Sequence, residues 1–162
     1  MNIKMSFLQT RRFVKLIAWL VALTVVLFVN INSAVAASAT DVKVYRDPDC
    51  GCCGHWVDYL KTQGFQPENI PISNIDTLKQ RYGVPNDLVS CHTAVIDGYL
   101  VEGHVPVEDI KRLLTEQPDI AGIAVPGMPV GTPGMESGDV HEPFKVYSFG
   151  TQGIQLFHQY MF

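Results

Sequence analysis

Residues 42–53 read VKVYRDPDCGCC and join the pattern of a strand to the pattern of a helix start. The first five residues begin with an alternation of β-branched and charged side chains and continue with an aromatic one, which predicts a β-strand. A Cys-x-Cys-Cys run begins at Cys50, directly after Asp-Pro-Asp. We expect a helix from Cys50 to about Gln63, because positions 53, 57 and 60 share one apolar face and Gly64 can end the helix.

The stretches that follow continue the alternation of strands and helices. They predict a strand over 68–72, a helix capped at Ser73 and stopped by Gly83, a hairpin of strands over 93–97 and 99–104, and a helix over 106–117. The order over 42–117 is β-α-β-α-β-β-α with a C-x-x-C motif right after the first strand, and this order resembles the thioredoxin fold. We therefore expect an α/β, thioredoxin-like domain over 42–117.

Residues 118–162 form a different kind of segment. Gly and Pro dominate 122–138, where the tripeptide Pro-Gly-Met occurs twice and ends at Met128 and at Met135. Two alternating stretches, 144–149 and 154–160, flank a Gly-Thr-Gln-Gly turn and predict a β-hairpin. We expect this C-terminal Gly/Pro-rich extension to contribute to a metal site.

The N-terminus has the three regions of a secretory signal. Positive side chains lead into an unbroken apolar run over 16–29, and small residues follow at 34–36. The run is shorter than the roughly 20 residues of a membrane span, which favours a signal over an uncleaved anchor. We expect a signal peptide over 1–36, cleaved near Ala36, and a periplasmic mature protein.

Composition narrows the classes of function. The 162 residues carry 12 Lys and Arg against 16 Asp and Glu, and no basic run follows the N-terminus, so we expect no nucleic-acid partner. A hydrophobic content of 47% excludes a disordered chain. Four cysteines are too few for a disulfide scaffold, and unpaired thiols in an exported protein need a chemical reason. We expect a monomer.

The C-x-x-C pair itself suggests thiol chemistry. A helix N-terminus stabilises a thiolate, so Cys50 is the candidate attacking thiol and Cys53 the candidate resolving thiol of a catalytic pair. The alternative is a simple structural disulfide between them. Asp47 and Asp49 flank Cys50 and disfavour its thiolate, but they suit a site that receives a cation.

A metal site is the competing interpretation. Where thioredoxin-like proteins place a cis-proline, this sequence has His92, preceded by Cys91, so Cys91 should face the other three thiols. The topology should bring His104 to the same end of the sheet, and the extension can fold its two methionines over it. Thiolates and thioethers form a soft donor set that suits Cu(I). The predicted metal ligands are Cys50, Cys52, Cys53, Cys91, His104, Met128 and Met135.

Copper is favoured over zinc, which would also fit the ligand count. Zinc sites favour two paired C-x₂-C knuckles, which this sequence lacks, and thioethers add nothing for zinc. Crowded thiolates at C-x-C spacing can bridge metal ions. We therefore expect several copper ions rather than one.

Three stretches together carry a family resemblance. DPDCGCCGHW (47–56), CHTAVIDGYLVEGHVP (91–106) and AVPGMPVGTPGME (124–136) resemble the family catalogued as domain of unknown function 411, whose described members are CopG-like periplasmic copper-resistance proteins. The resemblance covers Val42 to about Glu136. It implies a thioredoxin-like domain with a metal-binding extension, a cysteine-bridged multi-copper cluster and a role in Cu(I)/Cu(II) interconversion. By motif, its ligands correspond to Cys50, Cys52, Cys53, Cys91, Met128 and Met135.

Three functions stay open on the sequence. The first is an exported copper-binding redox protein of copper resistance, in which thiol and metal oxidation are coupled. The second is a periplasmic thiol–disulfide oxidoreductase that acts on proteins. The third is a passive copper store or chaperone. The expected partners are copper ions, with a copper exporter or a periplasmic redox protein as the candidate protein partner.

Overall fold

A computed structural model describes residues 41–162, so the predicted signal peptide over 1–36 lies outside the described residues. The described chain belongs to one compact unit, Ala39–Phe162. None of the helices in this part of the chain is long and apolar enough to cross a membrane. In chain order the elements are β1 (Asp41–Arg46), α2 (Gly51–Thr62), β2 (Gln66–Pro71), α3 (Ile75–Tyr82), the 3₁₀ helix η1 (Asn86–Leu88), β3 (His92–Ile96), β4 (Tyr99–Glu102), α4 (Val107–Glu116), β5 (Gly122–Ala124), β6 (Phe144–Gly150) and β7 (Gly153–Tyr160).

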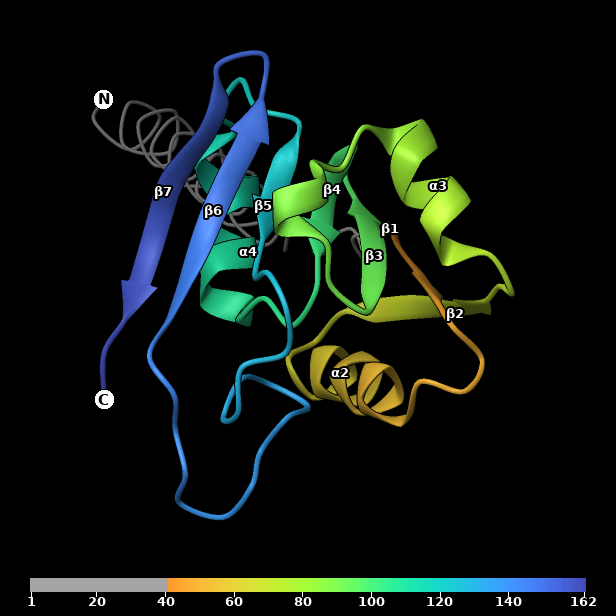
Figure 1. Cartoon of the computed structure of the whole chain (residues 1–162), viewed down its shortest axis with the longest axis vertical. Coiled ribbons are helices and arrows are strands. Elements are labelled where there is room, and N and C mark those ends of the chain that lie inside the picture. Colours follow the sequence, from red (N-terminus) through yellow and green to blue (C-terminus); the bar gives the residue numbers. More distant parts are fainter. Residues whose placement is uncertain (1–40) are drawn as a thin grey trace, which may run out of the picture. The chain divides into compact units, whose positions relative to one another are not determined.

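A seven-stranded sheet in the order β2-β1-β3-β4-β5-β6-β7 organises this unit (Figure 1). β1 pairs with β2 and β4 pairs with β5 in parallel, and the other neighbours are antiparallel. β3 therefore begins at the end of the sheet where β1 finishes and α2 starts. The extension continues the same sheet, because β5 pairs with β4 and the β6–β7 hairpin pairs with β5.

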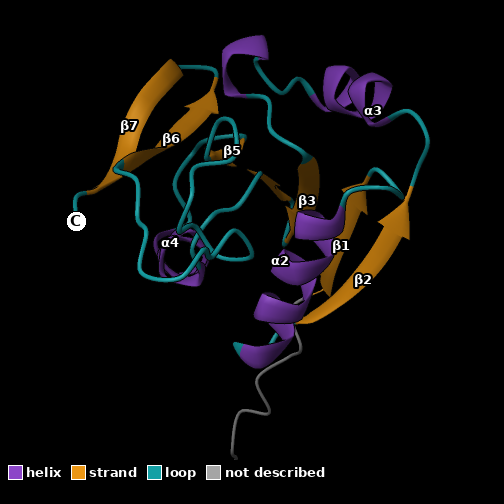
Figure 2. Ribbon diagram, turned by 60° about the horizontal axis from the view of Figure 1, so that its bottom comes forward, coloured by secondary structure: helices purple, strands orange, loops and turns teal. Residues whose placement is uncertain are grey.

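Alternating apolar side chains build a core on each face of the sheet. On one face, Trp56 of α2 and Ile110 of α4 pack with strand residues such as Ile96. On the other face, a smaller cluster joins Leu88 of η1 to Leu100 and other strand residues. In Figure 2, α3 lies at the top of the view, and α2 and α4 lie below it.

The α/β class and the predicted element order are confirmed, and the thioredoxin-like assignment stays a prediction. One detail of capping was wrong. Asn74, not Ser73, caps α3, and its side chain accepts the Thr77 N–H at 3.1 Å. Ser and Asn are equally good caps, so the local pattern does not decide between neighbours. β5 escaped the sequence patterns because its three residues are too few to show alternation.

Candidate metal centre

Hydrogen bonds to the backbone shape the loop before α2. Arg46, the last residue of β1, donates from Nη1 to the carbonyl oxygens of Asp47 and Pro48 at 2.9 and 3.1 Å. The Asp47 carboxylate accepts the Asp49 N–H at 2.8 Å, so it closes this turn. Cys50 follows as the N-cap of α2. The run Cys50–Cys53 thus lies where unpaired helix N–H groups stabilise negative charge.

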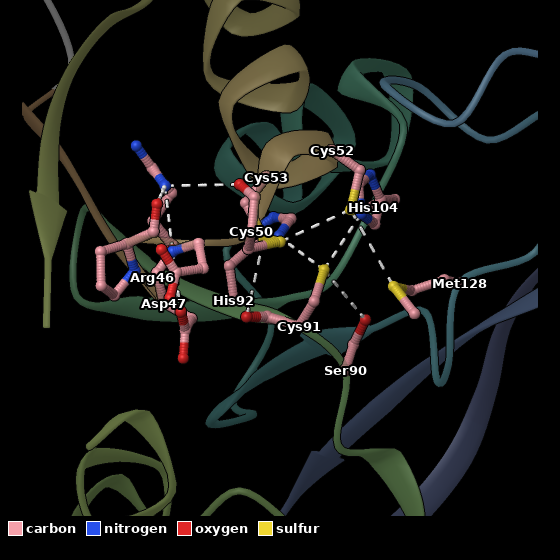
Figure 3. Close-up of a disulfide and its surroundings, with 12 residues drawn as sticks. Arg46, Asp47, Cys50, Cys52, Cys53, Ser90, Cys91, His92, His104 and Met128 are labelled. Atoms are coloured by element: carbon pink, nitrogen blue, oxygen red, sulfur yellow. Dashed lines mark hydrogen bonds between the residues drawn. A yellow bond between two sulfur atoms is a disulfide. The ribbon is translucent and has the colours of Figure 1, made fainter. Parts of the chain in front are cut away.

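Four cysteine sulfurs converge at this helix N-terminus (Figure 3). The Sγ atoms of Cys50, Cys52, Cys53 and Cys91 all lie within 4.8 Å of one another. Cys50 and Cys53 are joined by a disulfide, whereas Cys52 and Cys91 carry free thiols. The Cys52 Sγ lies 3.5 Å from the Cys50 Sγ. The structure therefore holds the predicted catalytic pair in its oxidised form, with two free thiols beside it.

Two buried histidines flank Cys91. The Cys91 Sγ lies 3.1 Å from the His104 Nε2 and 3.3 Å from the His92 Nδ1. The His104 Nδ1 lies 2.8 Å from the Pro133 carbonyl oxygen. Because a carbonyl only accepts, we assign the neutral-ring proton to Nδ1, which leaves the Nε2 lone pair directed at Cys91. The sequence placed His92 only as a substitute for a proline, yet its Nδ1 lies almost as close to the Cys91 thiol as the His104 Nε2 does.

Burial controls the protonation of these three residues. It raises the pKa of the Cys91 thiol to about 12, and the neighbouring Cys52 adds to the rise. Burial also lowers the pKa of His92 well below its ordinary value and lowers the pKa of His104. In the metal-free protein at neutral pH, Cys91 is thus a thiol and both imidazoles are neutral. Neutral imidazoles offer a lone pair to a metal ion.

The extension reaches the site through Met128. Its Sδ lies 4.0 Å from the Cys52 Sγ, and its side chain is half exposed. Met135 is partly buried, and its carbonyl accepts the Gly131 N–H at 3.0 Å. Within residues 41–162, no hydrogen bond ties the Met135 side chain to the cysteines. Of the two predicted thioethers, the structure places Met128 against the thiols.

Two glycines allow the segments around the site to approach closely. At Gly134, φ is +83° and an added Cβ would lie 2.7 Å from the Trp56 backbone nitrogen in α2. At Gly103, φ is +75° and an added Cβ would lie 2.5 Å from the Ser90 Oγ. Side chains other than hydrogen are strained at such φ values. Gly103 thus lets the chain turn sharply after β4 and bring His104 against Cys91.

A buried polar network on the other face of β3 was missed by sequence reasoning. Lys79 and Glu102 are 3% and 0% exposed and form an ion pair. Thr93 accepts from the Lys79 Nζ at 3.1 Å and donates to the Glu102 Oε2. The Glu102 Oε1 also accepts the backbone N–H of Ser90 at 2.7 Å, so the network holds the backbone that leads into Cys91. No local signal marks these residues, because α3, β3 and β4 contribute one each.

The donor set suits a soft metal ion. When the disulfide is reduced, four thiols and the Met128 thioether are available at one end of α2. Thiolates and thioethers are the ligands that Cu(I) prefers. The His104 Nε2 adds a nitrogen donor on the Cys91 side.

Comparison with known proteins agrees with this chemistry. The family model described as "Protein of unknown function, DUF411" matches residues 88–135. A solved structure named copper resistance protein CopG, form 2, is 42% identical with a TM-score of 0.73, and the match covers 76% of this chain and all of that chain. This chain belongs to the CopG copper-resistance family.

A second CopG structure, form 1, is 43% identical with a TM-score of 0.72, and the match covers 76% of this chain and 98% of that one. No curated protein matches the chain. The predicted family resemblance is confirmed. Membership in the CopG family and the cluster of four cysteines together fit copper binding.

Proposed function

We propose that this protein is exported and serves copper resistance by binding several copper ions at the cysteine cluster and by interconverting or sequestering Cu(I) and Cu(II). The observation that supports this proposal most directly is the convergence of four Sγ atoms within 4.8 Å. The name of the similar structures, copper resistance protein, points to the same metal. Copper is here the bound substrate of the protein.

Thiolate bridging accounts for several ions in so small a site. The Cys50 and Cys52 sulfurs are already at 3.5 Å, a separation at which two thiolates can share metal ions. Met128 approaches the same Cys52 from the solvent side, and it supplies a thioether suited to Cu(I). The Cys91 thiol, just before β3, and the His104 Nε2, just after β4, close the site on the side of the sheet.

The Cys50–Cys53 pair provides the electrons for copper reduction. When both residues are thiols, two Cu(II) ions accept one electron each, and the two sulfurs form the disulfide with loss of two protons. Two Cu(I) ions result, for which Cys52, Cys91 and Met128 are soft ligands. The disulfide in this structure corresponds to the protein product of that step.

An anaerobic titration tests the binding proposal. The fully reduced protein is titrated with Cu(I), and copper per protein is measured beside the number of free thiols. We expect more than one copper per protein with all four thiols protected. A single bound ion contradicts the multi-copper site, and no bound copper contradicts the proposed function.

A second titration tests the redox proposal. Cu(II) is added to the reduced protein in the presence of a Cu(I)-specific chromogenic chelator. We expect two Cu(I) ions for each disulfide formed, and none from a Cys50→Ser/Cys53→Ser variant. If the protein binds Cu(I) but reduces no Cu(II), it is a passive store or chaperone.

A thiol–disulfide oxidoreductase is the second candidate, because the disulfide lies at a helix N-terminus where an exchanging pair belongs. A Cys53→Ser variant would then trap partner proteins as mixed disulfides through Cys50.

Export is tested separately by the mass of the protein in the periplasmic fraction. We expect its N-terminus at Ala37.

A further inference from the structure

The imidazoles of His92 and His104 lie against the Cys91 thiol, which takes no part in the disulfide. Cys91 keeps its thiol in this structure, and it contacts the His92 Nδ1 at 3.3 Å and the His104 Nε2 at 3.1 Å. The three donor atoms lie within 4.8 Å of one another. Both histidines are fully buried. His92 begins β3, and His104 lies in the turn after β4, where the Pro133 carbonyl of the extension faces its Nδ1 at 2.8 Å.

Cys91, His92 and His104 together carry too few protons to give every ring nitrogen a hydrogen bond. Cys91 has one proton to donate, and the His104 Nε2 lone pair takes it, because the Nδ1 of that ring faces Pro133. If His92 carries its proton on Nδ1, its buried Nε2 has no hydrogen-bond partner. If the proton is on Nε2, that N–H forms no hydrogen bond of good geometry, although the Gly103 backbone favours it, and the Nδ1 lone pair faces a sulfur with no proton to give. Either tautomer leaves a buried nitrogen unpaired, which is unfavourable.

Packing fixes the His92 ring in this costly position. The ring lies 4.4 Å from the Trp56 ring, between centroids, and 4.9 Å from the His104 ring. An apolar side chain would fill the same space without an unpaired nitrogen. The imidazole is explained if its Nδ1 lone pair binds a ligand that also binds Cys91.

We propose that Cys91, His92 and His104 form a site for one divalent copper ion, and that this site stays available when Cys50 and Cys53 are oxidised. The inference rests on the proposed copper function and names where Cu(II) binds. A sulfur and a nitrogen that share one ion at the usual bond lengths lie about 3.1–3.6 Å apart. The observed separations of 3.1 and 3.3 Å are in this range. Imidazole nitrogens suit Cu(II), and binding releases the Cys91 proton to solvent.

The disulfide changes which donors the site offers. In the reduced protein, four thiolates and Met128 form a soft set that favours Cu(I). In the disulfide form, Cys50 and Cys53 no longer ligate, and Cys91 with its two imidazoles remains as a mixed sulfur and nitrogen set that a divalent ion can occupy. Cys52 and Met128 stay beside it as the soft ligands for Cu(I).

The test uses the protein in its disulfide form, with two free thiols confirmed by titration. Co(II) is the first probe, because it does not oxidise thiols, and Cu(II) is the second, observed by electron paramagnetic resonance. We expect one Co(II) per protein with a sulfur-to-cobalt charge-transfer band. We also expect a Cu(II) spectrum split by two nitrogens.

A His92→Asn variant should bind Co(II) on the order of 10–100-fold more weakly, and its Cu(II) spectrum should show one nitrogen. His55→Asn is the matched control, because His55 is an exposed imidazole on α2 and its loss should leave both readouts unchanged. If His92→Asn does not fold, the nitrogen count of the unaltered protein still decides. A splitting from one nitrogen or none overturns the proposal.

Two further results separate this proposal from the proposed function. If the reduced protein binds Cu(I) but the disulfide form binds no Co(II), the divalent site is refuted and the proposed function stands. If the disulfide form binds Co(II) through His92 but the reduced protein binds no Cu(I), the proposed function is refuted and the divalent site stands.

Discussion

Two buried polar clusters share β3 and the end of β4, and they differ in how fully their hydrogen bonds are paired. Successive side chains of a strand point to opposite faces, so His92 lies with Trp56 on the α2 face and Thr93 lies with Lys79 on the α3 face. The α3-side network consists of Lys79, Thr93 and Glu102. The α2-side cluster, which is the candidate metal centre, consists of the four cysteines, His92, His104 and Met128.

The α3-side network is saturated in the sense that every buried polar atom of its side chains has at least one hydrogen-bond partner. Glu102 accepts from Lys79, Thr93 and the Ser90 N–H, and none of the three side chains has an unpaired buried polar atom. In the metal centre, the buried His92 Nε2 has no partner, and two imidazoles compete for one thiol proton. The comparison indicates that a saturated cluster stabilises the fold, whereas an unsaturated one is suited to bind a ligand. The predictions below test that division.

The largest effect should be a loss of stability in Lys79→Met. Removing one partner of a buried ion pair leaves Glu102 charged and uncompensated, which lowers the free energy of unfolding by about 3–5 kcal/mol. Denaturant titration followed by circular dichroism measures it. Lys61→Met is the control, since Lys61 pairs with Asp58 in an exposed i,i+3 pair and should change stability little. Equal losses in the two variants would refute the structural role of the network.

Cys91→Ser should weaken copper binding and leave the stability of the fold nearly unchanged, which is the reverse of the effect of Lys79→Met. It removes a thiol that belongs both to the cluster of four cysteines and to the group of Cys91, His92 and His104. We therefore expect Cu(I) affinity to fall by at least about 100-fold. The unfolding free energy of the metal-free protein at pH 7 should stay within about 1 kcal/mol, because Ser is smaller and tolerates a polar environment. Competition with a Cu(I) chelator measures the first quantity and denaturation the second. Unchanged affinity would remove Cys91 from the site.

Gly103→Ala tests the turn that joins the two clusters. Gly98 is the control, because it also has positive φ (+83°) but no atom lies within 4 Å of an added Cβ. Both variants suffer the backbone strain of about 1–2 kcal/mol. Gly103→Ala should lose about 2 kcal/mol more, since its Cβ would overlap the Ser90 hydroxyl. Equal losses of unfolding free energy would mean that the close contact is relieved cheaply.

The pKa of Cys91 predicts a smaller, pH-dependent effect in the metal-free disulfide form. Its folded pKa is raised to about 12 from an ordinary value of 9.0, so the unfolded state loses the proton first as pH rises. The unfolded state then binds fewer protons than the folded state, and stability falls with pH. The stability of the protein relative to Cys91→Ser should therefore be constant below pH 9 and fall above it. A constant difference up to pH 11 in denaturant titrations contradicts the raised pKa.

The smallest effect should be a difference in Cu(I) affinity between substitutions of the two methionines of the extension. Met128→Leu removes a thioether that lies 4.0 Å from Cys52, and Cu(I) affinity should fall by roughly tenfold. Met135→Leu should have less effect, since its backbone closes a turn of the extension instead. The same chelator competition measures both. Equal losses would show that Met135 also reaches the copper, as the sequence pattern predicted.

Local patterns were enough to predict most of the fold. The alternation in β1, the apolar spacing in α2 and the Gly and Pro stop signals are short-range properties of the chain. Once the order of strands and helices was known, topology placed Cys91 at the start of β3 and His104 after the end of β4. Both lie beside the thiols at the start of α2, as expected.

Only the tertiary structure decided which of these groups are paired. The Lys79–Glu102 ion pair spans 23 residues, the His104–Pro133 contact 29, and the Cys52–Met128 contact 76. Hydrogen bonding and ligation require interatomic distances that are correct to within a few tenths of an ångström. Residue spacing along the chain does not encode distances at that precision. The sequence by itself therefore determined the element order and the donor types. Packing decided that His92 lies against Cys91 and that Thr93, its neighbour, joins the network that holds the backbone before Cys91.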